Sequence, residues 1–142
     1  MQEQSGRSLI EIVGVLAIGV IMIASVYNMY RSIDQRQKRM IAYEDVKEIA
    51  RKTKILYEYS GYNDLSVSKL VAAGALSSTT APIGSWTISS HNKNSEFKIT
   101  LSKLTHNECK YFATKKSSDW AYNTSASCGA SESNPSITFF VK

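Results

Sequence analysis

The chain has 142 residues, of which 43% are hydrophobic and 20% charged, and it carries a net charge of +5. This length suits one soluble domain with an appended helix, and the composition excludes a disordered tail. The positive charges form no dense basic block, so no specific nucleic acid is predicted as a partner.

The first predicted element is an apolar helix near the N-terminus. From Ile12 to Ala24 the chain has no charged residue and no proline, and its apolar character continues to Tyr30. As a helix, Ser8 to Tyr30 would be about 35 Å long, which matches a bilayer core of about 30 Å. Glu11 lies just inside this run, and an ionisable side chain in a membrane span is a functional candidate.

Three interpretations of this helix compete. A cleavable secretory signal needs a basic start and a small-residue cleavage site, whereas residues 1–6 carry only Glu3 as a charge and no clear site follows Ala24. A plain signal anchor would leave Glu11 unexplained. The third interpretation is a helix that is processed at Gly6, on the cytoplasmic side of the membrane.

The third interpretation comes from a resemblance. The sequence Gly-Arg-Ser-Leu-Ile-Glu at residues 6–11, followed by the apolar run, resembles the class III signal of type IV pilins. The resemblance implies a leader of residues 1–6, cleavage between Gly6 and Arg7 by a prepilin peptidase, and methylation of the new amine of Arg7. It also implies that the helix of residues 7–30 spans the membrane and later forms the core of a filament. The chain departs from the family in having Arg7 where an apolar residue is usual, and in lacking a basic residue in the leader.

Glu11 is the predicted assembly residue. A carboxylate among packed helices needs a cationic partner, and cleavage after Gly6 would create one at the amine of Arg7. We hypothesise that Glu11 of one subunit pairs with this amine of the next and sets the stagger of assembly. The alternative is an acid that extends to the interface without a partner. Gly14 and Gly19 would allow neighbouring helices to approach closely, and partial unwinding between them is a further hypothesis.

The helix is predicted to continue through residues 31–60 as an amphipathic segment that stops at Ser60-Gly61. Residues 31–39 are mostly polar and are expected to form a neck that stands apart from the globular domain. Beyond the neck, apolar or small residues recur every three or four positions, which predicts one buried face packed on a sheet. These residues are Ala42, Val46, Ile49, Thr53 and Leu56, with Tyr43, Ala50 and Tyr57 beside them at intervals of seven.

Residues 61–142 are predicted to form a globular α+β head. The pattern predicts a short capped helix over 64–74, strands over 86–89 and 97–101 with a turn at 91–95, a helix over 105–115, an irregular segment over 117–133 and a closing strand over 137–141. The predicted fold is therefore a long N-terminal helix packed against a small antiparallel sheet. The short helix, a Pro-x-Gly-x-Trp turn at 82–86 and a C-terminal cysteine pair resemble the type IVb pilins.

The two cysteines bear on the compartment. Cys109 and Cys128 are most simply one disulfide if the head is exported. The basic residues at 31–39 favour the opposite orientation, a cytoplasmic head with free thiols, because basic flanks tend to stay inside. The cysteine pair and the pilin resemblance together favour a head outside the cytoplasm.

Several short motifs suggest chemistry and are better explained otherwise. Ser66 and Lys69 match the Ser-x-x-Lys acylation motif, but its partner motifs are missing. His106 and Cys109 have helical spacing for two metal ligands, but nothing clusters with them. Asn123 begins a glycosylation sequon, which matters only in a eukaryotic secretory route. We therefore predict no enzyme activity, no cofactor and no metal site.

The expected function is that of a structural subunit of a bacterial type IV pilus. The resemblance implies three partners: other copies of the chain in a helical homopolymer, the prepilin peptidase, and the inner-membrane pilus assembly machinery. It places the chain first in the inner membrane with a periplasmic head, then in the extracellular pilus. The alternatives are a pseudopilin of a type II secretion system and a membrane-anchored binding protein that never polymerises.

Overall fold

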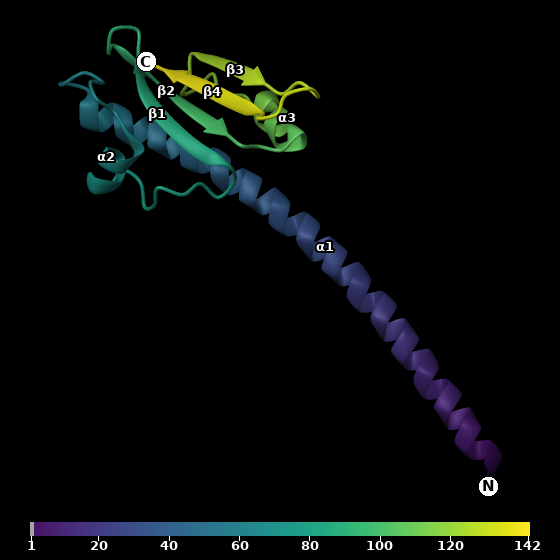
Figure 1. Cartoon of the computed structure of the whole chain (residues 1–142). Coiled ribbons are helices and arrows are strands. Elements are labelled where there is room, and N and C mark those ends of the chain that lie inside the picture. Colours follow the sequence, from purple (N-terminus) through teal and green to yellow (C-terminus); the bar gives the residue numbers. More distant parts are fainter. Residues whose placement is uncertain (1) are drawn as a thin grey trace. The chain divides into compact units, whose positions relative to one another are not determined.

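The computed structural model describes the backbone of residues 2–142 and the side chains of residues 8–142. Its longest element is the helix α1, which spans Gln2–Tyr57 without interruption (Figure 1). No proline occurs in this segment, so each turn after the first can keep its backbone hydrogen bonds. The chain divides into two compact units, one ending at Gln37 and the other beginning at Lys38.

The N-terminal unit is helical throughout its described part. Between Leu9 and Tyr30 its large hydrophobic side chains are 55% to 73% exposed. The hydroxyl of Ser25 donates a hydrogen bond to the carbonyl oxygen of Ile21, 2.8 Å away, so this polar group is satisfied within the helix. The helix is long and apolar enough to cross a membrane, with a mean hydropathy of 2.6 over its most apolar 18 residues.

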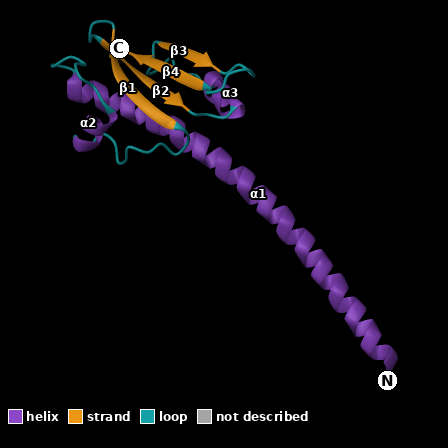
Figure 2. Ribbon diagram, viewed as in Figure 1, coloured by secondary structure: helices purple, strands orange, loops and turns teal. Residues whose placement is uncertain are grey.

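The C-terminal unit, the head, contains a four-stranded sheet (Figure 2). Its strands are β1 (Ser85–His91), β2 (Glu96–Ser102), β3 (Asn123–Ser127) and β4 (Ser136–Val141). The order across the sheet is β1-β2-β4-β3, and every neighbouring pair is antiparallel. The predicted α+β fold, a long helix packed with a small antiparallel sheet, is therefore confirmed.

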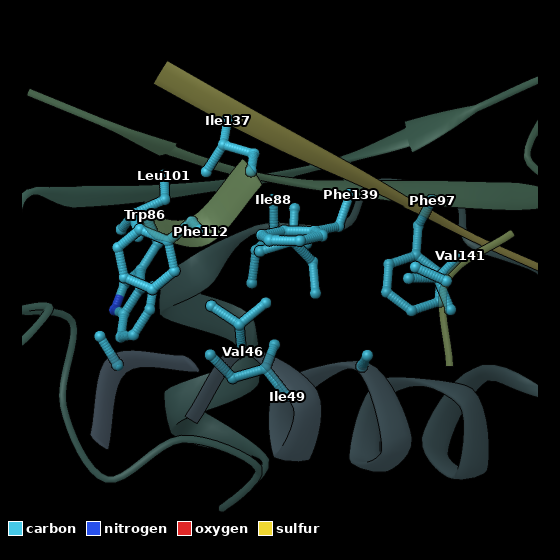
Figure 3. Close-up of a cluster of buried hydrophobic side chains, with 14 of the residues drawn as sticks. Val46, Ile49, Trp86, Ile88, Phe97, Leu101, Phe112, Ile137, Phe139 and Val141 are labelled. Carbon is cyan, nitrogen blue, oxygen red and sulfur yellow. The ribbon is translucent and has the colours of Figure 1, made fainter. Parts of the chain in front are cut away.

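The core of the head lies between the sheet and the part of α1 that follows Lys38. Val46 and Ile49 project from α1 toward side chains of the strands (Figure 3). In the strands, inward and outward residues alternate, so each strand presents one apolar face. The fully buried strand side chains are Phe97, Ile99, Leu101, Ile137, Phe139 and Val141.

The predicted buried face of α1 is confirmed at four of its five positions. Ala42, Val46, Ile49 and Thr53 are buried, whereas Leu56 is 46% exposed, so its assignment was wrong. The residues predicted beside them are confirmed as well, since Ala50 is 1% exposed and the rings of Tyr43 and Tyr57 are half-buried against the core.

The short helices begin later than predicted. The helix α2 spans Val67–Ala72, and its cap is Ser66, whose side chain accepts a hydrogen bond from the backbone N–H of Lys69. Asp64, taken as the start of this helix, has a φ of +58° and cannot belong to it. The helix α3 spans His106–Thr114.

The cap of α3 explains its sharp start. The Thr105 side chain accepts from the backbone N–H of Glu108, and the Glu108 carboxylate accepts from the backbone N–H of Thr105. This reciprocal pair satisfies two N–H groups that a helix otherwise leaves open. Cys109 and Phe112 of this helix are both buried.

The prediction of an irregular segment over 117–133 was wrong at β3. This strand pairs with β4 from Asn123 opposite Phe140 to Ser127 opposite Ser136. Four of its five residues are exposed, and its sequence Asn-Thr-Ser-Ala-Ser has no apolar alternation. Main-chain pairing with β4 therefore defines the strand, and that pairing leaves no hydrophobic pattern in the sequence.

Candidate assembly surface and processing site

The most extended exposed apolar area in the described residues belongs to α1 between Ser8 and Tyr30, here called the assembly surface. Its apolar side chains surround the whole helix, rather than one face of it. A helix that is apolar all round must be covered by lipid or by other protein. The surface therefore fits both a membrane span and a helix bundle.

Glu11 lies on the assembly surface as predicted. Its side chain is exposed and lines a shallow groove on α1 with Ser8, Ile12, Val15 and Leu16. Among the described side chains none forms an ion pair or a hydrogen bond with its carboxylate. The groove thus combines apolar walls with one acidic group.

Gly6 and Arg7, the predicted processing pair, both lie within α1. A side chain at Gly6 would meet nothing within 4 Å, so packing within this chain does not require glycine there. The side chain of Arg7 lies outside the described residues. A glycine that the fold does not require is consistent with a role in recognition by another protein.

Gly14 and Gly19 are two positions without a side chain on the assembly surface. A Cβ added at either residue would meet nothing within 4 Å. Small residues at such positions let a second helix approach closely. The helix α1 runs through both glycines without a break, so the single chain is not unwound between them.

The predicted pairing of Cys109 and Cys128 is confirmed. The two residues form a disulfide with a Cα–Cα distance of 5.5 Å across a sequence separation of 19. Cys109 is buried on α3, and Cys128 directly follows β3. The bond therefore ties α3 to the edge of the sheet, and it closes a loop that includes β3.

The motifs that suggested chemistry have structural roles. Ser66 caps α2, and the ammonium of Lys69 pairs with the carboxylate of Asp64. These contacts account for both residues of the Ser-x-x-Lys match. Cys109 is oxidised in the disulfide, so it cannot act with His106 as a metal ligand.

A second groove lies in the head, between α1 and the segment that follows α2. It is lined by Asp45, Glu48, Lys52 and Trp86, with several small hydroxyl residues. Partial burial raises the pKa of Asp45, whereas the hydrogen bond from Arg51 lowers the pKa of Glu48 to about 2. The two neighbouring acids of this groove are therefore shifted in opposite directions.

Two groupings were missed by the sequence analysis. Glu96 accepts a hydrogen bond from the hydroxyl of Tyr122, and Arg39 of α1 lies over the ring of Tyr111 of α3. Both pairs are far apart in the sequence and have no motif spacing. Only the strand order and the docking of α3 bring them together.

The chain was also compared with known proteins. No family model matches it, and no curated protein sequence matches it.

Proposed function

We propose that this chain is a structural, non-enzymatic subunit of a bacterial type IV pilus. It polymerises through its N-terminal helix after a prepilin peptidase cleaves between Gly6 and Arg7. One observation carries the proposal: the pilin-like signal opens a helix whose exposed apolar surface holds a single carboxylate, that of Glu11. The α+β head and the disulfide support the same assignment.

The assembly surface explains why the chain would exchange lipid for copies of itself. Each exposed Leu, Ile or Val side chain gains about 1.5–3 kcal/mol on leaving water, so the surface stays in lipid until other subunits cover it. Lipid tails are as apolar as these side chains, so hydrophobicity alone does not drive the helices together. Close packing at Gly14 and Gly19 and a polar contact at Glu11 supply the missing attraction.

The polar contact joins Glu11 of one subunit to the amine of Arg7 of the next. Cleavage creates that amine, so only processed subunits can form the pair. In the dry interior of a helix bundle, removal of one partner of such a pair costs about 3–5 kcal/mol. The pair thereby fixes the axial offset between neighbouring subunits.

The proposal also assigns partners and location. The subunit resides first in the inner membrane with its head in the periplasm, then in the extracellular filament. It meets the prepilin peptidase and the inner-membrane assembly machinery on the way. The Cys109–Cys128 disulfide favours a type IVb pilin over a type II secretion pseudopilin, which typically has a calcium loop near its C-terminus.

The first experiment tests processing. The full chain is expressed with a prepilin peptidase, and the mass of the membrane form is measured. We expect the loss of residues 1–6 from the wild type and from a Gly19→Ala control, but not from Gly6→Ala. A wild-type chain that keeps all six residues would support a permanent membrane anchor and reject the pilin assignment.

The second experiment tests the pairing. Glu11→Gln removes the charge and keeps the shape, so membrane insertion should be unchanged while sheared surface filaments disappear. Glu44→Gln is the matched control, since Glu44 is an exposed acid on the same helix. Normal filaments from Glu11→Gln would show that the acid has no partner in the assembly.

A further inference from the structure

One face of the head gathers cationic and aromatic side chains, here called the basic–aromatic patch. It combines two residues of α1 with residues of α3 and of the segment that follows it (compare α1 and α3 in Figure 1). All lie within the C-terminal unit. The members of the patch are Arg39, Tyr43, Tyr111, Lys115, Lys116 and Trp120.

The rings hold the cations in place. The ammonium of Lys115 lies 4.9 Å from the ring centroid of Tyr111 and 5.8 Å from that of Tyr43. The guanidinium carbon of Arg39 lies 5.9 Å from the Tyr111 centroid. These distances are within the range of cation–π attraction, which uses the ring faces and leaves the charge uncompensated.

Hydrogen bonds hold the rings in turn. The hydroxyl of Tyr43 donates to the carbonyl oxygen of Lys116 at 2.8 Å, and the indole N–H of Trp120 donates to that same hydroxyl at 3.4 Å. The Trp120 ring also packs on Phe139 of the core, with centroids 4.9 Å apart. The rings of Tyr43 and Trp120 are thus anchored to the core of the head.

The positive charge of the patch is available. Lys115 and Lys116 are exposed, and no carboxylate in the described part of the chain pairs with either of them or with Arg39. An anionic ligand therefore has no carboxylate of the described residues to displace from these cations.

We infer that the basic–aromatic patch docks the head on a membrane surface that contains anionic phospholipids. This inference rests on the proposed membrane anchoring of α1. Arg39 follows Tyr30, the end of the assembly surface, by nine residues. Even a fully extended chain of nine residues spans only about 30 Å, so the anchor keeps the patch near the bilayer whatever the orientation of the head.

The chemistry of the patch matches an anionic bilayer surface better than a soluble polyanion. Tyrosine and tryptophan prefer the interface of a bilayer, where an apolar ring and a polar edge are both satisfied. Each lysine or arginine near an anionic bilayer surface strengthens binding about fivefold. Lipid phosphates near the anchor are also present at high local concentration, unlike a polyanion in solution. The docked head would hold a subunit flat on the membrane until assembly lifts it away.

The test uses the intrinsic fluorescence of the full chain in vesicles. The chain has two tryptophans, of which Trp86 is buried in the core and Trp120 belongs to the patch. A headgroup-attached nitroxide lipid quenches only indoles near the bilayer surface. Vesicles of phosphatidylcholine are compared with vesicles that also contain phosphatidylglycerol, and Trp120→Phe identifies the quenched signal.

We expect quenching only in the anionic vesicles, and we expect a several-fold loss of it in 0.5 M salt. The double variant Lys115→Gln/Lys116→Gln should abolish it, whereas Lys54→Gln/Lys93→Gln, with the same charge change at two exposed positions, should not. Equal quenching in both vesicle types, or none in a chain that resists carbonate extraction, rejects the inference and leaves the pilin proposal standing. Binding of a single-stranded oligonucleotide without quenching in anionic vesicles would reassign the patch to nucleic acid. Extraction of the chain by carbonate would reject the membrane anchor itself.

Discussion

Tyr122 donates a hydrogen bond from its hydroxyl to the carboxylate of Glu96, with the two oxygens 2.6 Å apart. Glu96 begins β2, and Tyr122 directly precedes β3, so the bond crosses the sheet over β4. The bond lowers the pKa of Glu96, as do Asn92 and the nearby charges, against a smaller opposing effect of burial. It also raises the pKa of Tyr122. The edge strand β3 is thus linked to the centre of the sheet by a bond that depends on pH.

Removal of this bond by Tyr122→Phe should change the pH dependence of stability in a defined direction. A carboxyl whose folded pKa is lowered stabilises the fold above its ordinary pKa of about 4.3, and loses that contribution as the pH falls through the folded value. A phenol whose folded pKa is raised loses its contribution as the pH rises beyond about 10. Urea unfolding should therefore show the largest difference between variant and wild type at about pH 5–9.

The control for this measurement is Tyr59→Phe, because Tyr59 is 98% exposed. It should match the wild type at every pH. A Tyr122→Phe curve parallel to the wild type from pH 3 to pH 10 would mean that the hydrogen bond does not contribute to stability.

Gly84→Ala should be strongly destabilising. Gly84 has a φ of +69°, and a Cβ there would lie 2.3 Å from the carbonyl oxygen of Ser102. Gly74 has a similar φ of +74°, but a Cβ there would meet nothing within 4 Å. Gly74→Ala should therefore cost only the backbone strain of about 1–2 kcal/mol, and Gly84→Ala clearly more. Equal losses in thermal denaturation would mean that the backbone at Gly84 shifts to relieve the clash.

Reduction of the Cys109–Cys128 bond should destabilise the head by about 3 kcal/mol, since the bond closes a loop of about 20 residues in the unfolded chain. The measurement is urea unfolding with and without a reducing agent. The double variant Cys109→Ala/Cys128→Ala serves as the control and should not respond to the reducing agent. An identical midpoint for the oxidised and reduced wild type would show that the loop is held by other contacts.

Ile49→Ala should cost about 2–5 kcal/mol, because Ile49 is 2% exposed and its truncation leaves a cavity between α1 and the sheet. Ile55→Ala on the same helix is the matched control, since Ile55 is 60% exposed. That change should lie within about 0.5 kcal/mol of the wild type. Similar losses from both substitutions would place the buried face of α1 elsewhere.

The sequence predicted most of the fold where hydrophobic patterning determines structure. The periodicity of α1 located Val46 and Ile49 in the core. The hydrophobic pattern was less informative for β3, because main-chain hydrogen bonds to β4 define that strand. It was also less informative near the C-terminal end of α1, where Leu56 is exposed although it continues the apolar spacing. The disulfide followed from the cysteine pair, whereas the contact of Glu96 with Tyr122 depends on strand order and had no sequence signal.

The candidate site divides in the same way. Glu11 was identified from the sequence alone, because an acidic residue within an apolar run is unusual. The basic–aromatic patch was not, because the sequence shows Tyr43 only as a position of the apolar face of α1 and Lys115 only as one lysine among many. Their significance arises only when α3 brings the lysine over the ring.

The edge strand β3 has a consequence for how this protein can vary. Its partner β4 holds it through the peptide backbone, and most of its five side chains point into solvent. Almost any residue except proline would be accepted at the outward positions. Substitutions can therefore accumulate along this rim of the sheet while the core beneath it keeps its packing.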